Sequence, residues 1–204
     1  MAHERITITM DKHLLGQIDI LVKKNGLRNR SNAINYFVKS ALPQTELNFA
    51  VVCVGGRGVE KSSGYIIKVM KCLLVEGIDQ FMIIYGHYGQ SIKSILEAQH
   101  QFEDKLQFSF TDLGSGGGLK QIYDQLPNQF VLVNIQEKID LNWDNLQKYH
   151  QKYAAAVTMQ ISGHYRGVAI VNKTFVDQIA NQFSIIEDDI LPKLTSETDI
   201  IYLP

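Results

Sequence analysis

The chain has 204 residues, 45% of them hydrophobic, and a formal net charge of −1, which suits one α/β domain and a small additional module. No run of about 18 apolar residues is present, and the opening MAHERITITM lacks the apolar core of a signal peptide. We therefore expect a cytoplasmic protein that is not bound to a membrane. Cys53 lies in an apolar strand pattern and Cys72 in a helical pattern, which favours two small buried side chains over a disulfide framework or a zinc site.

The charges are unevenly distributed along the chain. Residues 1–43 carry seven Lys and Arg against three acidic residues, whereas the remainder carries 13 basic and 18 acidic residues. This distribution indicates that the basic residues 1–43 bind a polyanion and that the acidic remainder of the chain does not.

The first 43 residues have the pattern of a strand followed by two helices. Side chains in RITITM alternate between an apolar face and a polar face that holds Arg5, Thr7 and Thr9. Asp11 is placed to cap the first helix, and a second helix begins near Asn29 or Ser31. A single strand in so short a unit needs a partner, and an identical chain is the simplest one.

The segments ERITITM, DKHLLGQIDILVKKNG and LRNRSNAINYFVKSAL together resemble the ribbon-helix-helix family of dimeric DNA-binding proteins. The resemblance implies a DNA-binding and dimerisation domain at 1–43, whose ribbon lies in the major groove of a double-stranded DNA operator. It assigns the DNA contacts to six residues. Base edges would be read by Arg5, Thr7 and Thr9, and a phosphate would be held by the amides around Asn29, Arg30 and Ser31. The alternative is that the first three only form the solvated face of an edge strand.

Residues 48–204 alternate apolar runs with helical patterns. Strands are predicted at 48–54, 81–86, 106–113 and 130–135, and helices at 64–76, 89–98 and 117–125. This order is typical of an α/β fold with a doubly wound, mostly parallel sheet. A ligand site is then expected beyond the carboxyl ends of the strands, where the glycine motifs GGRG, GHYG and GSGGG gather.

Two common phosphate-binding motifs are excluded at the first of these loops. Read as a P-loop, GGRGVEKS has Glu60 in the place of the second glycine, and read as a dinucleotide fingerprint it has Lys61 in the place of the third.

Four segments, VVCVGGRG, YIIKVMKCLLVEGIDQFMIIYGHYGQSIKSIL, LGSGGGLKQIYDQL and IEDDILPKL, nevertheless resemble in their order the sugar-phosphate nucleotidyltransferase family. Members of that family join a nucleoside triphosphate to a sugar phosphate and release pyrophosphate. The resemblance implies that a nucleotide or nucleotide sugar would contact Gly55, Gly56, Arg57, Gly58, Gly116, Gly117 and Gly118. The alternative is that these glycines only allow tight turns. His87 and Tyr88 either line the rim of this pocket or are ordinary surface residues.

Two departures from the family affect its chemistry. The metal-binding aspartate of the family follows the strand written here FVLVN, where this chain continues from Asn134 to Glu137 without an aspartate. Glu137 or Asp140 is the available substitute. The lysine segment of the family after Gly58 is also missing. We therefore expect no metal site, no catalytic residues and no cofactor, and hence no enzyme.

The sequence as a whole predicts a sequence-specific transcriptional regulator, a repressor that binds its operator as a homodimer or a dimer of dimers. The domain at 48–204 would be a non-catalytic ligand sensor or scaffold. One alternative is an active metal-dependent nucleotidyltransferase with an N-terminal dimerisation arm. Another is an antitoxin-like DNA-binding protein with a protein partner.

Overall fold

The computed structural model describes residues 9–24, 29–31, 33–34, 47–55, 59–134, 138–153, 155–161, 167–193 and 200–203. The chain divides into two compact units, Met1–Glu46 and Leu47–Pro204. Within the described part, none of the helices is both long and apolar enough to cross a bilayer.

The N-terminal unit contains helix α1, Lys12–Lys24. The Asp11 carboxylate caps α1, because it accepts hydrogen bonds from the backbone N–H of His13 at 2.7 Å and of Leu14 at 3.3 Å. The predicted capped helix is thus confirmed. Residues 30–31 and 33–34 are also helical, as expected for a helix that begins near residue 29. The predicted strand lies outside the described residues except for its end at 9–10, which forms no strand within this single chain.

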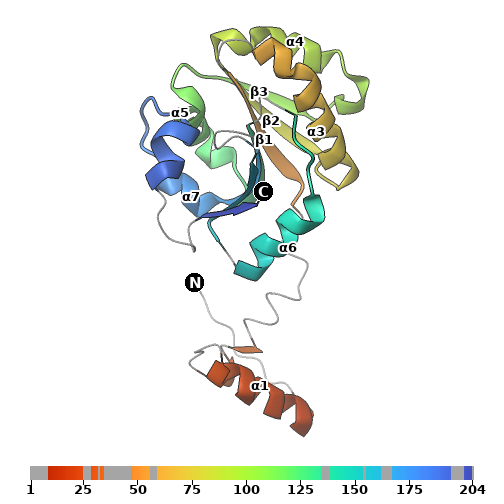
Figure 1. The fold of residues 1–204 in the computed structure, drawn as a ribbon, viewed down its shortest axis with the longest axis vertical. Helices are drawn as coiled ribbons and strands as arrows, with labels where there is room; N and C mark the ends of the chain where they lie inside the picture. Colours follow the sequence, from red (N-terminus) through yellow and green to blue (C-terminus); the bar gives the residue numbers. More distant parts are fainter. Residues whose placement is uncertain are drawn as a thin grey trace. The chain divides into compact units, whose positions relative to one another are not determined.

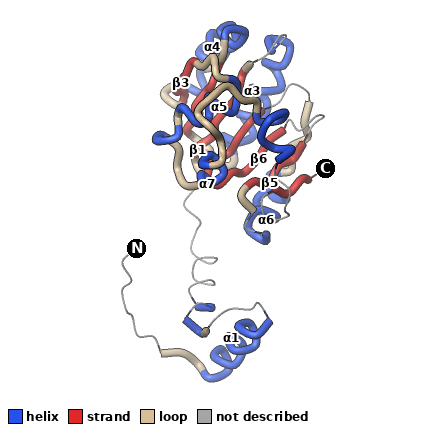
Figure 2. Tube along the Cα trace, turned by 90° about the vertical axis from the view of Figure 1, so that its left-hand side faces the viewer, coloured by secondary structure: helices blue, strands red, loops and turns tan. Residues whose placement is uncertain are grey.

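The C-terminal unit is built on one sheet (Figures 1 and 2). The seven described strands have the order β3-β2-β1-β4-β6-β5-β7. Their bounds are Phe49–Val54 (β1), Gln80–Tyr85 (β2), Leu106–Phe110 (β3), Gln129–Asn134 (β4), Val157–Ile161 (β5), Gly167–Asn172 (β6) and Ile200–Leu203 (β7). Strand β6 is antiparallel to both of its neighbours, and the other pairings are parallel. The expected mostly parallel α/β sheet is confirmed.

Helices cover both faces of this sheet (Figure 1). They are α3 (Ser63–Val75), α4 (Gln90–Glu97), α5 (Gly114–Gln121), α6 (Trp143–Tyr153) and α7 (Lys173–Asp177). Short helical turns connect these elements, namely η1 (Val59–Ser62), η2 (His87–Gly89), η3 (His100–Phe102), η4 (Tyr123–Gln125), η5 (Ile186–Ile190) and η6 (Leu191–Lys193).

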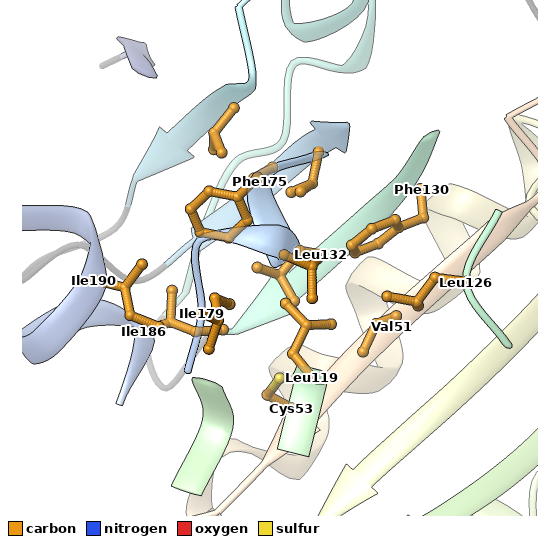
Figure 3. Close-up of a cluster of buried hydrophobic side chains, with 14 of the residues drawn as sticks. Val51, Cys53, Leu119, Leu126, Phe130, Leu132, Phe175, Ile179, Ile186 and Ile190 are labelled. Atoms are coloured by element: carbon orange, nitrogen blue, oxygen red, sulfur yellow. The ribbon is translucent and has the colours of Figure 1, made fainter. Parts of the chain in front are cut away.

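The alternation of side chains along the strands divides the core in two. In β1, Ala50 and Val52 pack with apolar residues of α3, α4 and α6 on one face. Val51 and Cys53 point to the other face, toward Leu119 of α5 and residues of α7 (Figure 3). Both faces of the central strands are therefore buried, which explains their continuous apolar sequences.

One expectation about the cysteines is wrong. Cys53 is buried as predicted, but Cys72 is exposed. The buried stripe of α3 consists of Ile66, Val69, Met70 and Leu73. Cys72 precedes Leu73 by one residue, about 100° around the helix, and so lies outside the stripe.

Candidate functional site

A cavity of about 370 Å³ lies at the carboxyl ends of β1, β2, β3 and β4. The chain runs from β1 outward to β2 and β3 and then returns to β4 on the other side of β1. The cavity is therefore at the point where the strand order reverses, the usual ligand site of doubly wound folds. Its described lining residues are Cys53, Val54, Gly55, Ile84, Gly86, His87, Tyr88, Thr111, Asp112, Gly114, Ser115, Asn134, Phe183, Ile185 and Glu187.

Aromatic side chains stand at the rim of the cavity. Tyr88 of η2 is 51% exposed and Phe183 is 61% exposed, although both line the cavity. The His87 ring, also part of the lining, meets the Phe110 ring edge-on with centroids 5.2 Å apart. Of the two alternatives for His87 and Tyr88, the structure thus supports the rim. Exposed rings beside a cavity offer flat apolar faces to a ligand.

A buried carboxylate lies at the end of β4. Glu187, at the start of η5, is only 5% exposed and lines the cavity. Its Oε1 accepts a hydrogen bond from the Nδ2 of Asn134, the last residue of β4. The backbone N–H of the neighbouring Ile186 donates to Ser115 Oγ at 3.0 Å. These contacts join β4, α5 and η5 around one polar corner of the cavity.

The Cys53 thiol lies close to this carboxylate. Burial, and secondarily the negative charge of Glu187, raise the pKa of Cys53 far above its usual range. The thiol therefore stays protonated at neutral pH, and Cys53 is neither a nucleophile nor a metal ligand in this state.

The whole glycine run at 114–118 belongs to α5, so the helix predicted at 117–125 begins three residues earlier, at Gly114. Gly114 has φ 74° and lines the cavity. Gly116, Gly117 and Gly118 are buried and are not part of the described lining. A Cβ on Gly116 would lie 2.5 Å from Ser184 Oγ, and one on Gly117 would lie 2.5 Å from the Gln182 carbonyl oxygen.

The missing side chains thus allow a second segment to pack directly on α5. The N–H of Gly116 donates to the Ser184 carbonyl oxygen at 2.9 Å, and the N–H of Ser184 donates to the Leu113 carbonyl oxygen at 2.9 Å. This close approach brings the chain after Ser184 to the cavity and so positions Glu187. Contact of these glycines with a nucleotide stays a prediction.

The other predicted ligand contacts lie in the first glycine loop. Gly55 is exposed and lines the cavity. Gly56, Arg57 and Gly58 lie outside the described residues, so their role stays a prediction.

The predicted DNA contacts are described only in part. Arg5 and Thr7 lie outside the described residues, whereas Thr9, Asn29 and Ser31 are exposed. The Arg30 guanidinium forms a two-point ion pair with Asp19 of α1, with Nε–Oδ1 2.6 Å and Nη2–Oδ2 2.7 Å. The hydrogen bond and charge of Asp19 raise the pKa of Arg30. This guanidinium is thus occupied within the unit, and the DNA contacts stay predictions.

Sequence reasoning missed most residues of the cavity lining, among them the polar and aromatic side chains of Asp112, Ser115, Phe183 and Glu187. Asp112 lies near the end of the predicted strand at 106–113 and two residues after the observed strand β3, and an acidic residue at the end of an apolar run was the signal that could have identified it. Glu187 stands in IEDDILPKL, but its position beside β4 depends on a contact across 53 residues of sequence.

The carboxylates do not make a resident metal site in the described part of the chain. There, no group of three or more His, Cys, Asp or Glu is close enough to hold an ion. Asp140, one of the two suggested substitutes for the metal-binding aspartate, lines a different cavity, beside α6. Glu137, the other, lies outside the described residues. The donors that the structure describes at the end of β4 are an amide and one carboxylate that bind each other, which by themselves do not make a preformed carboxylate cage.

The comparisons with known proteins identify the fold. No protein-family model matches the chain, and no curated protein matches it in sequence. HddC from Yersinia pseudotuberculosis has a similar structure, with TM-score 0.60 and 16% identity over 76% of this chain and 89% of that one. The unit has a nucleotidyltransferase-like fold.

HddC complexed with GMP-PN is also similar, with TM-score 0.60 and 14% identity over 76% of this chain and 90% of that one. The inositol-1-phosphate CTP transferase from T. maritima has TM-score 0.54 and 9% identity over 79% of this chain and 86% of that one. Rv0371C from Mycobacterium tuberculosis, in complex with manganese, has TM-score 0.50 and 15% identity over 76% of this chain and 86% of that one.

These similarities correct the function expected from the sequence. A DNA-binding transcriptional regulator with a non-catalytic second domain is contradicted, because the structures that share the fold include a CTP transferase and a nucleotide complex. The expectation that the chain is not an enzyme, which rested on missing family residues, is corrected for the same reason. The findings favour the alternative of a nucleotidyltransferase.

Proposed function

We propose that the C-terminal unit is a nucleotidyltransferase that binds a nucleoside triphosphate and transfers its nucleotidyl group to a phosphate-bearing acceptor. The observation that carries this proposal is the cavity at the carboxyl ends of β1, β2, β3 and β4, beside the reversal of strand order. The fold shared with a CTP transferase and with HddC, which has been seen with GMP-PN, supports it.

The main contribution of the protein to this reaction is to position the nucleoside triphosphate and the acceptor phosphate. An oxygen of the acceptor phosphate forms a bond to the α-phosphorus, the bond from that phosphorus to the bridging oxygen of the β-phosphate breaks, and pyrophosphate leaves. The acceptor oxygen is already anionic at neutral pH, so the step needs no general base. The protein must align the two reactants and exclude water.

The described residues supply such alignment. The exposed rings of Tyr88 and Phe183 offer stacking faces for a nucleobase. The exposed carboxylate of Asp112 offers oxygens that accept hydrogen bonds from hydroxyl groups of either substrate. Ser115 Oγ already accepts from the N–H of Ile186, and its hydroxyl proton is still available to donate.

The N-terminal unit is proposed to be a dimerisation arm of ribbon-helix-helix type. Ile18 and Ala33 are buried within the unit, while Leu14 and Ile20 of α1 are 46% and 65% exposed. A unit of this size rarely buries enough apolar surface to fold alone, and a second copy would cover these side chains. A cytoplasmic location belongs to the same proposal.

Pyrophosphate release tests the catalytic proposal. The full chain is incubated with Mg²⁺, each of the common nucleoside triphosphates and a panel of sugar phosphates and polyol phosphates. We expect release with one donor and acceptor class, and a kcat/KM about tenfold or more lower in Asp112→Asn. Asp124→Asn, an exposed change on η4 outside the cavity lining, is the matched control. The absence of release with every combination would overturn the proposal.

A further inference from the structure

Strand β3 lies at one edge of the sheet, and among the described strands its one neighbour is β2. The residues that flank β3 direct their backbone groups inward. The carbonyl oxygen of Lys105 and the N–H of Thr111 form hydrogen bonds with β2 at 2.8 and 2.9 Å. Since the backbone groups of successive strand residues point to opposite sides, Leu106, Phe108 and Phe110 direct their N–H and carbonyl groups to the free edge.

The same three residues carry the apolar side chains of β3. Leu106 and Phe108 are only partly buried against the core, and Phe110 is 44% exposed. The Phe110 ring meets the ring of Tyr85 edge-on, with centroids 5.6 Å apart, and Lys93 Nζ lies 5.0 Å from the centroid of the Phe108 ring. A half-covered apolar row therefore runs directly beside the open backbone groups.

The usual protections of a sheet edge are missing from this strand. Natural proteins protect an edge with charged side chains, proline or a β-bulge. Residues 106–111, LQFSFT, contain no charged residue and no proline, and β3 follows β2 without a break in register. An edge with these properties favours pairing with a further strand.

The strand is complementary to itself when two copies run antiparallel. If Phe108 lies opposite Phe108 of the partner subunit, Leu106 lies opposite Phe110 of the partner subunit, and every outward N–H of the three residues meets an outward carbonyl oxygen. A shift of two residues in either direction leaves some of these groups unpaired. The left-handed backbone of Asp104, with φ 60°, ends the run at Lys105.

We propose that β3 is a homodimerisation edge, at which two copies of the chain pair antiparallel about a two-fold axis through Phe108 and join their sheets. The strand contact alone buries less than the about 1,200 Å² of a standard interface, so this pairing is weak and forms in concentrated protein. The inference goes beyond the proposed function and does not depend on it.

A register-specific disulfide tests the pairing in the full chain. Gln107 would lie opposite Ser109 of the partner subunit, in a non-hydrogen-bonded pair with Cα atoms about 4.5 Å apart. A disulfide spans roughly 4.4–6.8 Å, whereas each of these residues would lie about 7–8 Å from its own copy. Chains with Gln107→Cys and chains with Ser109→Cys are mixed and oxidised in concentrated solution. Both carry Cys72→Ser, which removes the exposed native thiol.

We expect the mixture to form disulfide-linked dimers in a yield about tenfold or more above that of either variant alone. No linked dimer in the mixture, or equal yields in the mixture and in the separate variants, would overturn the proposal. The yield reports the register at β3, so it does not depend on any association through Met1–Glu46.

Two charge variants test the cause. Gln107→Lys with Ser109→Lys places like charges opposite each other across the axis and should weaken the pairing, whereas Gln107→Lys with Ser109→Glu places opposite charges there and should keep it. Hydrogen exchange of the Phe108 N–H, followed by nuclear magnetic resonance, measures the pairing. In concentrated wild-type protein we expect this amide to exchange about tenfold or more slowly than in dilute protein. The like-charge variant should lose this protection and the opposite-charge variant should retain it.

The N–H of Thr111 is the internal control, because it donates to β2 within the same copy. Its continued protection in the like-charge variant shows that β3 is still folded onto β2. If that variant loses the protection of Thr111 as well, the disulfide yields decide. Exchange of the Phe108 amide that is independent of wild-type concentration would contradict the proposal, as would equal exchange in the two charge variants. An edge that binds an extended peptide of another protein instead of a second copy would give this result.

Discussion

The Nε2 atom of His150 on α6 lies 2.9 Å from the side-chain Nε2 of Gln129 at the start of β4. An amide nitrogen only donates, so the imidazole Nε2 must accept, and the ring proton is assigned to Nδ1, which lies 3.0 Å from Thr158 Oγ1. Protonation of His150 would turn two donors toward each other. The neutral ring is therefore part of the packing between α6 and the sheet.

This arrangement predicts a loss of stability in mild acid. Burial lowers the pKa of His150 in the folded protein. Between the folded and the unfolded pKa, the unfolded chain therefore binds a proton at this residue that the folded chain does not bind. The contribution is fully present above the unfolded pKa of about 6.5 and declines as the pH falls from there toward the folded pKa, by at most about 1.4 kcal/mol per pH unit. Urea unfolding between neutral and mildly acidic pH measures it. A His150→Gln variant with the same pH slope as the wild type would contradict this, and His100→Gln, at an exposed position, is the control.

Removal of the Glu187 side chain should destabilise the fold. Glu187→Ala leaves the Asn134 amide without its acceptor in a mostly buried corner, which costs about 1–3 kcal/mol of unfolding free energy. Glu187→Gln keeps an acceptor oxygen and should cost less. The matched control is Glu97→Ala, whose exposed carboxylate lies 3.9 Å from Lys93, with an expected change within about 0.5 kcal/mol. Denaturant midpoints give the comparison, and equal effects of Glu187→Ala and Glu97→Ala would refute the structural role.

Two glycine substitutions should change the free energy of unfolding in opposite directions. Gly117→Ala places a Cβ 2.5 Å from the Gln182 carbonyl oxygen, so the segment that carries Glu187 must move away from α5, at about 1–3 kcal/mol. Gly64→Ala, in α3, meets nothing within 4 Å and should stabilise the protein by about 0.5–1 kcal/mol. Thermal and urea unfolding measure both. Destabilisation by Gly64→Ala, or none by Gly117→Ala, would be inconsistent with the packing described.

A substitution at the rim of the cavity should lower the affinity for nucleotide and leave the stability of the fold nearly unchanged. Phe183→Ala removes an exposed ring at the mouth of the cavity, and loss of base stacking costs about 1–3 kcal/mol of binding free energy. Tyr153→Ala, at the exposed end of α6 and away from the cavity lining, is the control and should bind nucleotide normally. Calorimetric titration with nucleoside triphosphates compares the two variants. Equal affinities would show that the base lies elsewhere.

Much of the fold follows from local patterns in the sequence. The predicted strands at 48–54, 81–86, 106–113 and 130–135 each overlap an observed strand, because apolar runs bounded by turn residues suit strands that are buried on both faces. The Asp11 cap could also be predicted from the sequence, since a helix cap depends only on residues two or three positions away. The place of the cavity followed from the same order of elements.

The sequence by itself thus determined the α/β architecture, the capped first helix and the end of the sheet at which the cavity lies. The tertiary structure alone decided that Gly116 and Gly117 pack against a distant segment, that Arg30 pairs with Asp19, and that Glu187 binds Asn134. The physical reason is the range of the interactions. Strand and helix periods are set by near neighbours, whereas a glycine that admits a distant segment, or a carboxylate that meets an amide 53 residues away, depends on contacts that exist only once the sheet has formed.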